Sequence, residues 1–172
     1  MFRLAFLFAA AALATGAVAA GPAVRTVESV DLARYAGKWY EIAHLPMFFQ
    51  RQCVGDTTAE YTQNADGSLA VNNRCRTKDG SIDAASGTAT VVEGSGNAKL
   101  EVSFFKPFKG AYWIIGLDPD YRWAVVGSPD RDNLWILSRR TQLAPADLQN
   151  ALAVAKAQGY ALDELRYTPQ QR

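Results

Sequence analysis

Short segments with the character of β-strands follow one another along most of the chain. In residues 99–105 polar and apolar side chains alternate, which is the period of a strand with one buried face. Pairs such as Asp66-Gly67 separate neighbouring segments, and glycine there accepts the positive φ of a hairpin turn. Further strands are expected at residues 38–44, 57–63, 68–75, 87–93, 111–117, 122–127 and 133–138, with a short final one at 164–167. About eight closely spaced strands predict an all-β sandwich or barrel.

One segment near the C-terminus has a helical pattern instead. Pro145 precedes residues 146–158 and Gly159 follows them, and these residue types are favoured at the start and just beyond the end of a helix. Leucine and alanine residues at helical spacing form a narrow apolar stripe within the segment. We therefore expect a single amphipathic helix that lies flat against the outside of the sheet.

The first twenty residues have the pattern of an export signal. Arg3 precedes a continuous apolar run that ends in small residues, as in a secretory signal peptide. A membrane anchor is the alternative, but the run is shorter than the roughly 20 apolar residues of a spanning helix. A bacterial lipoprotein signal would place a cysteine just after the run, whereas the first cysteine is Cys53. We expect residues 1–20 to be a signal peptide and residues 21–172 to form one exported domain, periplasmic or secreted. Association with the outer membrane stays open, without a lipoprotein cysteine.

The charge balance argues against nucleic acid as the main partner. The whole chain carries 18 basic and 17 acidic residues, and Arg3 is the only charged residue among the first twenty. The expected exported part is therefore neutral overall. Binding to phosphates requires a basic excess, which this part of the chain lacks.

Two cysteines, Cys53 and Cys75, flank a predicted hairpin. In an exported chain such a pair more often forms a disulfide than a metal site. A bond between them would restrict the unfolded chain and add about 3 kcal/mol of stability. We predict a Cys53–Cys75 disulfide, with buried free thiols as the alternative.

Three local motifs narrow the fold to a barrel. Residues 37–41 read GKWYE, residues 118–121 read DPDY ahead of a strand, and residues 134–139 read LWILSR just before the helix. In this order and spacing they resemble the three signatures of the lipocalins, most closely those of the bacterial lipocalin and apolipoprotein D branch. The second motif departs from the usual Thr-Asp-Tyr. The signature residues are Gly37, Trp39, Asp118, Tyr121 and Arg139.

The resemblance implies an eight-stranded antiparallel up-and-down β-barrel with one C-terminal α-helix packed outside. Trp39 would close one end of this barrel, and the Arg139 guanidinium would lie over its indole ring. Such a contact contributes about 0.5–2 kcal/mol, and Arg139 could also donate to carbonyl groups at the strand ends. We therefore interpret both residues as supporting the fold rather than contacting a ligand.

The resemblance also implies a function in binding, storage or transport of one small hydrophobic molecule, such as a fatty acid or a lysophospholipid. The interior of an eight-stranded barrel is just wide enough for such a ligand. Trp135 is the best-supported wall residue, because alternation places it on the face of Arg139. Glu41 shares the face of Trp39 and would need a hydrogen-bond partner, water or a proton there. The other cavity candidates are Tyr61, Phe104 and Trp113, for which ordinary core packing is the alternative.

Residues 45–56 are expected to form a long loop over the open end of the barrel. Met47, Phe48 and Phe49 are consecutive apolar residues in this loop, and exposed apolar patches commonly mark binding surfaces. They could tuck into the mouth, form a lid, touch a membrane or contact a second copy, and we favour the mouth or lid. The partners expected are therefore a lipid and, peripherally, a membrane, with the chain a monomer or a weak homodimer.

The residues offer no catalytic constellation. His44 is the only histidine, and a single histidine is more often structural than catalytic. The sequence also lacks a nucleophile elbow, a His/Cys metal cluster and a glycine-rich phosphate loop. We expect no enzyme activity, no cofactor and no metal. A lipocalin-fold enzyme of the isomerase type, using Glu41 with a tyrosine, and an envelope interaction protein with a filled barrel remain the alternatives.

Overall fold

The computed structural model describes residues 22–171, so the expected signal peptide at residues 1–20 lies outside the described residues. Strands dominate this range, with short helical segments between and after them. In chain order the elements are α1 (Leu32–Tyr35), β1 (Gly37–His44), the 3₁₀ turn η1 (Phe48–Gln50), β2 (Cys53–Gln63), β3 (Leu69–Thr77), β4 (Ile82–Val91), β5 (Lys99–Phe105), β6 (Phe108–Leu117), β7 (Trp123–Gly127), β8 (Leu134–Ser138), α2 (Pro145–Ala157) and β9 (Arg166–Tyr167).

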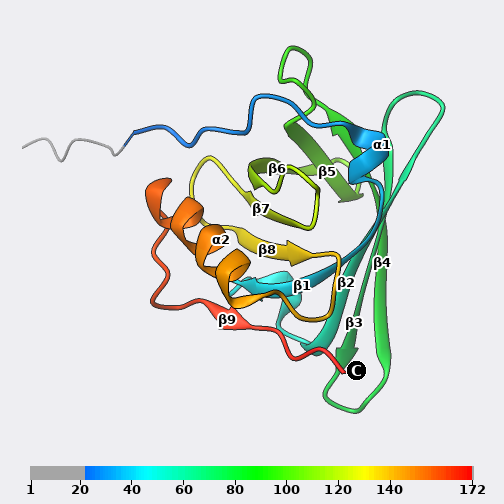
Figure 1. The fold of residues 1–172 in the computed structure, drawn as a ribbon. Helices are drawn as coiled ribbons and strands as arrows, with labels where there is room; N and C mark the ends of the chain where they lie inside the picture. Colours follow the sequence, from blue (N-terminus) through cyan, green and yellow to red (C-terminus); the bar gives the residue numbers. More distant parts are fainter. Residues whose placement is uncertain (1–21, 172) are drawn as a thin grey trace, which may run out of the picture.

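The strands β1 to β8 close into a barrel (Figure 1). Each pairs antiparallel with the next, and β8 returns to pair with β1, where Glu41 lies opposite Leu137. The two residues of β9 add a further strand beside the end of β1. Helix α2 packs outside the wall against β6 and β7. The expected eight-stranded antiparallel barrel with one external C-terminal helix is therefore confirmed.

Strand direction defines two different ends of the barrel. β1 starts at Gly37, and because neighbouring strands are antiparallel, the β2–β3, β4–β5 and β6–β7 connections lie at that same end. We call it the closed end, since α1 lies beside it (Figure 1). The opposite end, which we call the mouth, carries the connections at residues 45–52, 78–81, 106–107 and 128–133.

The two faces of the wall build two separate apolar layers. The interior layer includes Trp39 and Tyr61. The outer layer lies between the wall and α2 and includes Ile136 and Ala155. Because both faces are covered here, β7 is buried along its whole length, which explains why its sequence shows no alternation of polar and apolar residues.

Small residues bring α2 close to the wall. Ala151 and Ala155 are fully buried, and a Cβ atom placed on Gly116 of β6 would lie 2.8 Å from a Cγ atom of Val154. The helix starts at Pro145 and the chain turns away after it, as the sequence predicts. None of the helices in residues 22–171 is long and apolar enough to span a membrane.

The expectation that residues 45–56 form a loop is wrong beyond Gln52, because β2 begins at Cys53. The pairing of β2 with β3 shifts register twice between Cys53 and Thr58, and Asp56 has a positive φ of 53°. Such bulges interrupt the side-chain alternation by which a strand is predicted. The final strand is also shorter than expected, since only Arg166–Tyr167 is assigned to it.

Candidate functional site

A stack of Arg139 on Trp39 seals the closed end of the barrel. Trp39 is fully buried, and the Arg139 Cζ atom lies 3.8 Å from the centroid of its ring. The guanidinium also donates hydrogen bonds to four backbone carbonyl oxygens of α1, the residue after it and the start of β1. These belong to Arg34 (2.6 Å), Tyr35 (3.1 Å), Ala36 (2.9 Å) and Lys38 (2.9 Å). The contact implied by the resemblance is present, and it joins the end of β8 to the start of β1.

The turn between β6 and β7 ties the closed end to both helices. Asp118 is buried and accepts hydrogen bonds from Nε (3.0 Å) and Nη2 (2.7 Å) of Arg122. Although burial acts in the opposite direction, these bonds hold the pKa of Asp118 below its ordinary value. Arg122 also lies 3.1 Å from Asp147 in the first turn of α2, and the Tyr121 hydroxyl accepts from the Asp31 N–H ahead of α1 at 2.9 Å. Through Tyr121 and Arg122, this turn therefore contacts the segment ahead of α1 and the first turn of α2.

Three tyrosine hydroxyls form a hydrogen-bonded chain inside the barrel, next to Trp39. The Tyr112 hydroxyl oxygen lies 2.8 Å from that of Tyr35 and 2.8 Å from that of Tyr61. Burial raises the pKa of Tyr61 to about 12 and raises those of Tyr35 and Tyr112 well above their ordinary value, so all three stay neutral at physiological pH. Three hydroxyl protons serve two hydrogen bonds among the described residues, which leaves one O–H without an acceptor. Tyr61 lies inside as expected, while no sequence pattern identifies Tyr35 and Tyr112.

Toward the mouth, small side chains replace large ones on the inner face of the wall. Tyr61 on β2 lies opposite Val71 on β3. One inward position nearer the mouth, Ala59 on β2 lies opposite Asn73 on β3, and Asn73 in turn lies opposite Ala85 on β4. Ala85 is exposed although it shares its face with the buried Val71. The protein's own side chains therefore do not fill this part of the interior.

Trp135 and Phe104 face this space from opposite parts of the wall. Trp135 packs against the interior layer while part of its surface stays exposed, and its Nε1 atom lies 3.4 Å from Oε1 of Gln50. A Cβ atom on Gly87, which faces inward, would lie 2.8 Å from the Phe104 ring, and Phe104 is 45% exposed. Both side chains therefore present partly exposed surface on the inner face of the wall.

Trp113 does not line the interior, which corrects the expectation from the sequence. It lies opposite Lys99 across β5 and β6 and packs against the outer layer, with Lys99 Nζ 4.2 Å from its ring centroid. Its neighbour Tyr112 packs against the interior layer instead. The segment is apolar on both faces, because one covers the interior and the other meets α2. Alternation therefore cannot assign the direction of either aromatic side chain.

Met47, Phe48 and Phe49 lie on the β1–β2 connection at the mouth. Met47 is buried, whereas Phe48 is 75% exposed and Phe49 is 50% exposed. The Phe49 ring centroid lies 6.4 Å from that of the wall residue Trp135. Met47 is thus buried, whereas the two phenylalanines are presented at the mouth.

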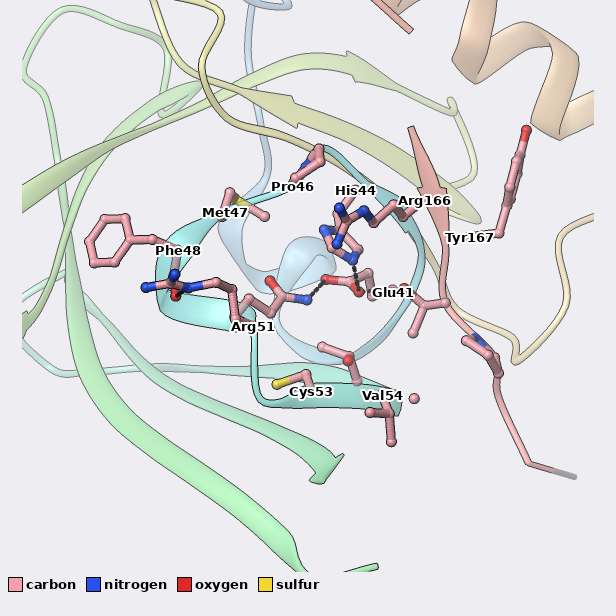
Figure 2. A pocket seen from close by; sticks show the side chains of 15 residues that line it. Glu41, His44, Pro46, Met47, Phe48, Arg51, Cys53, Val54, Arg166 and Tyr167 are labelled. Atoms are coloured by element: carbon pink, nitrogen blue, oxygen red, sulfur yellow. Dashed lines mark hydrogen bonds and ion pairs between the residues drawn. The ribbon is translucent and has the colours of Figure 1, made fainter. Parts of the chain in front are cut away.

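A lateral pocket of about 390 Å³ opens between this connection and the C-terminal residues (Figure 2). Glu41 lies buried in its wall, and its carboxylate accepts hydrogen bonds from Gln50 Nε2 at 2.7 Å and from the Thr168 hydroxyl. The His44 Nε2 atom lies 3.9 Å from the same carboxylate. Since Gln50 also contacts Trp135, it links the lateral pocket to the wall of the interior. The partners that Glu41 requires are thus supplied by the chain itself.

Residues 166–171, which we call the C-terminal strap, join β1 and β2 where these strands diverge. The last β1–β2 pair is Tyr40 with Thr58. Beyond it, Gln170 Nε2 donates to the backbone carbonyl oxygens of Glu41 at 2.8 Å and Thr57 at 2.9 Å. The strap therefore covers a gap in the barrel wall beside the lateral pocket.

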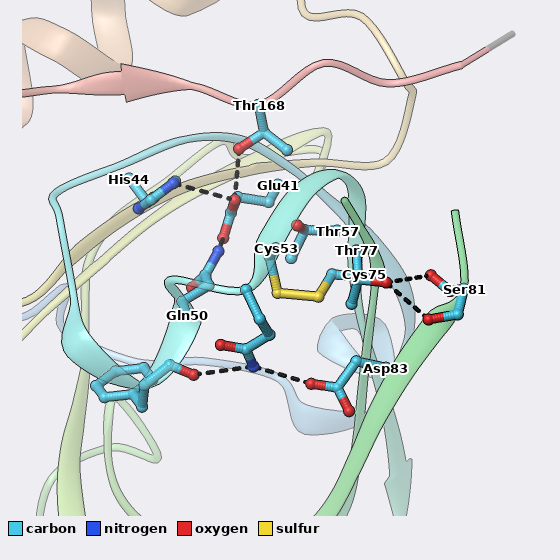
Figure 3. Close-up of a disulfide and its surroundings, with 12 residues drawn as sticks. Glu41, His44, Gln50, Cys53, Thr57, Cys75, Thr77, Ser81, Asp83 and Thr168 are labelled. Atoms are coloured by element: carbon cyan, nitrogen blue, oxygen red, sulfur yellow. Dashed lines mark hydrogen bonds and ion pairs between the residues drawn. A yellow bond between two sulfur atoms is a disulfide. The ribbon is translucent and has the colours of Figure 1, made fainter. Parts of the chain in front are cut away.

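The predicted Cys53–Cys75 disulfide is present (Figure 3). It joins the first residue of β2 to β3, with Cα atoms 5.5 Å apart. Beside it, Gln52 Nε2 donates to Oδ2 of Asp83 at 2.9 Å, which links the β1–β2 connection to β4. The phenylalanine-bearing connection is thereby fixed to two neighbouring strands.

His44 and the two cysteines are engaged in contacts within the fold. Within residues 22–171 no three His, Cys, Asp or Glu side chains gather as a metal site. The Nδ1 atom of His44 lies 2.7 Å from the Leu45 carbonyl oxygen, and its other ring nitrogen faces Glu41. Both cysteines are taken by the disulfide.

Comparison with known proteins agrees with this geometry. A family model described as a lipocalin-like domain matches residues 30–170. The outer membrane lipoprotein Blc of Escherichia coli is 40% identical over 148 residues, covering 86% of this chain and 83% of that protein. Apolipoprotein D of Mus musculus is 30% identical over 158 residues, with 87% and 82% covered. Among solved structures, insecticyanin from the tobacco hornworm Manduca sexta has a TM-score of 0.72 at 22% identity, over 88% of this chain and 86% of that one. With a matching family model over most of its length and such relatives, the chain belongs to the lipocalin family.

Proposed function

We propose that this protein binds one small hydrophobic molecule in the barrel interior, stores or transports it, and catalyses no reaction. The ligand is a fatty acid, a lysophospholipid or a similar lipid. The observation that carries the proposal is the inner face between the tyrosine chain and the mouth, where Ala85 and Phe104 are exposed. The closed end is densely packed around Trp39 instead. An interior filled at one end and open at the other suits an apolar ligand.

The open inner face also separates this proposal from its alternatives. An interaction protein with a filled barrel would bury its inward side chains, whereas Ala85 is exposed. An isomerase-like enzyme would need a free titratable group facing the substrate, but the Glu41 carboxylate is held by Gln50 and Thr168. We therefore favour a carrier and assign it no catalytic residue, cofactor or metal.

The proposed ligand contacts come from the wall and the mouth. Trp135, Tyr61 and Phe104 would supply apolar surface around the ligand, and Met47 with its two phenylalanine neighbours would cover the mouth. The unpaired proton of the tyrosine chain could donate one hydrogen bond to an oxygen at the inner end of the ligand.

We place this function in the cell envelope. The bacterial relative with 40% identity is named an outer membrane lipoprotein, and residues 1–20 resemble a secretory signal. The proposal is an exported protein of the periplasm or the exterior. It acts as a monomer or weak homodimer and touches a membrane only peripherally.

Trp135 and Trp113 provide a matched pair for the test, because the same side chain is removed from the inner or the outer face of the wall. Isothermal titration calorimetry of delipidated protein with oleate or lysophosphatidylcholine should show saturable binding for the wild type and for Trp113→Ala. Trp135→Ala should bind about tenfold more weakly, because apolar contact area is lost. Absence of saturable binding of both probes to the wild type, or an equal loss in both variants, would contradict the proposal.

A further inference from the structure

Large apolar side chains are left exposed mainly at one end of the barrel. Four phenylalanines at the mouth, which we call the phenylalanine rim, are each at least half exposed. They are Phe48, Phe49, Phe105 and Phe108. Ile82, the first residue of β4, is exposed at the same end. Apolar surface concentrated in this way marks a contact surface rather than scattered surface variation.

The β5–β6 hairpin carries two of the four rim phenylalanines, and their side chains do not pack into either core layer. Phe105 and Phe108 flank the turn Lys106-Pro107 and are 73% and 70% exposed. Their rings stack on each other, with centroids 6.3 Å apart and planes inclined by 14°. The two rings therefore form one apolar tip that projects beyond the layers of the core.

The two halves of the rim lie on opposite sides of the mouth. In the closed strand order, β3 and β4 separate the β1–β2 connection from the β5–β6 hairpin on one side, and β7 and β8 separate them on the other. The opening of the interior lies between these tips. A flat surface that touches both tips would therefore face the mouth directly.

Basic side chains accompany the phenylalanines. Arg51 follows Phe49 closely on the β1–β2 connection, and Lys106 and Lys109 lie on the hairpin. Of these three basic residues, Lys109 alone forms an ion pair among the described residues, with Glu101 at 2.7 Å. The two tips thus combine aromatic rings with three basic residues and one acidic residue, Glu101, while the other two connections at the mouth carry charges of both signs. Aromatic rings beside a net positive charge are the combination that binds the interface of an anionic bilayer.

We infer that the phenylalanine rim docks the mouth of the barrel onto the surface of an anionic lipid bilayer. The inference rests on the proposed function, because it names the surface from which a lipid ligand is taken or to which it is delivered. Docking would bring the opening of the interior against the lipid headgroups, so that an apolar ligand could pass without crossing bulk water. The membrane contact would then be peripheral and reversible.

A bilayer fits this surface better than a protein partner. A stable protein interface buries about 800 Å² on each side in a continuous, shape-complementary patch. The rim instead consists of two separate tips on either side of a hollow. A fluid bilayer accepts isolated protruding rings without complementary shape, and its anionic headgroups attract the adjacent lysine and arginine residues.

The test is flotation of the protein with vesicles of phosphatidylcholine in which about a third of the lipid is phosphatidylglycerol. The wild type should float with these vesicles, less so at high salt, and Phe105→Ser/Phe108→Ser should lower the partition coefficient about tenfold or more. Val92→Ser changes an exposed apolar residue at the closed end and should have no effect. Lys106→Gln should weaken binding about fivefold, whereas Lys38→Gln, at the closed end, should not.

Calorimetry with oleate on the same proteins separates this inference from the proposed function. Phe105→Ser/Phe108→Ser should bind oleate like the wild type, since neither side chain is assigned to the interior. A wild type that binds oleate but does not float would overturn the docking inference alone. So would equal flotation of the hairpin variant, or a concentration-dependent dimer in ultracentrifugation that this variant abolishes. Flotation without oleate binding would leave docking standing and contradict the carrier.

Discussion

At the scale of single residues, Arg139 shows why a planar cation is needed at the closed end. It lies over the Trp39 ring and at the same time donates to four carbonyl oxygens. A lysine has a single ammonium and cannot match this fork. Arg139→Lys should therefore lower the free energy of unfolding by about 2 kcal/mol in urea denaturation, while Arg140→Lys, at the exposed neighbour, should leave it unchanged. An unchanged stability combined with lost oleate binding would make Arg139 a ligand contact instead.

The loss of unfolding free energy should depend on which hydroxyl of the tyrosine chain is removed. Tyr112 is central, so Tyr112→Phe leaves the buried hydroxyls of both Tyr35 and Tyr61 without a partner. Tyr61→Phe removes only a terminal hydroxyl. We expect losses of about 3 kcal/mol for Tyr112→Phe and about 1 kcal/mol for Tyr61→Phe, because an unpaired buried group costs more than one missing bond. Urea denaturation measures both losses. A larger loss for Tyr61→Phe than for Tyr112→Phe would contradict the central position of Tyr112 among the three hydroxyls.

The same tyrosines predict a loss of stability at alkaline pH. In the unfolded chain a tyrosine ionises near its ordinary pKa of 10.0, whereas burial raises the pKa of Tyr61 to about 12. Between these values the folded state keeps protons that the unfolded state has released, so stability falls as pH rises through this window. The slope of unfolding free energy against pH should be smaller in Tyr61→Phe. Tyr167→Phe, which changes an exposed tyrosine, should keep the wild-type slope.

At the scale of elements, the sequence predicts the direction of the side chains on a strand well where one face is polar and poorly where both faces are covered. Alternation in β5 correctly separates the inward side chains from Lys99 and Glu101. In β6 and β8 both faces are apolar. For β8 the motif residue Arg139 fixes the direction, and Trp135 faces inward as expected. For β6 no such anchor exists, and only the pairing of Trp113 with Lys99 shows that it faces outward.

Contacts between distant residues that no motif or cysteine pair marks were beyond prediction from the sequence. Phe105 ends a predicted strand and Phe108 follows it closely in the sequence, and only the packed barrel shows that nothing covers their rings. Tyr35 precedes the first strand in the short helix α1, yet it reaches Tyr112 across the interior. Partners so far apart along the chain leave no local pattern, whereas turns and the C-terminal helix do.

The C-terminal strap is the element whose role is most open to direct test. Gln170 spans the gap between β1 and β2 with two hydrogen bonds to backbone carbonyl oxygens. Gln170→Ala should therefore lower the free energy of unfolding by about 1–2 kcal/mol. Gln149→Ala, on the exposed face of α2, is the matched control and should lie within about 0.5 kcal/mol of the wild type. Equal values for both variants would show that the strap contributes nothing to closing the wall.

At the scale of the whole molecule, contacts between elements are numerous at the closed end and unevenly distributed around the mouth. Arg139, Tyr121 and the tyrosine chain connect several elements at or near the closed end. Near the mouth, the first half of β4 pairs with β3 alone, because its pairing with β5 extends only from Thr88 to Val91. The disulfide and the strap reinforce β2 and β1, so the β4–β5 side is the least constrained part of the wall. Local opening is expected where backbone groups are exposed and contacts are few.

The rate of amide hydrogen exchange should therefore be highest on the β4–β5 side of the mouth. Amides of residues 82–87 should exchange much faster than those of β7, which is buried along its whole length. A lipid held in the interior binds the folded state only, and at about a hundred times its Kd it should stabilise that state by about 2.7 kcal/mol. Because it would also contact the inner face near Phe104, the added protection should be largest around β4 and β5. Equal exchange rates in residues 82–87 and in β7 would contradict the uneven constraint of the wall. Ligand protection confined to the closed end would show that the ligand does not occupy the open half of the interior.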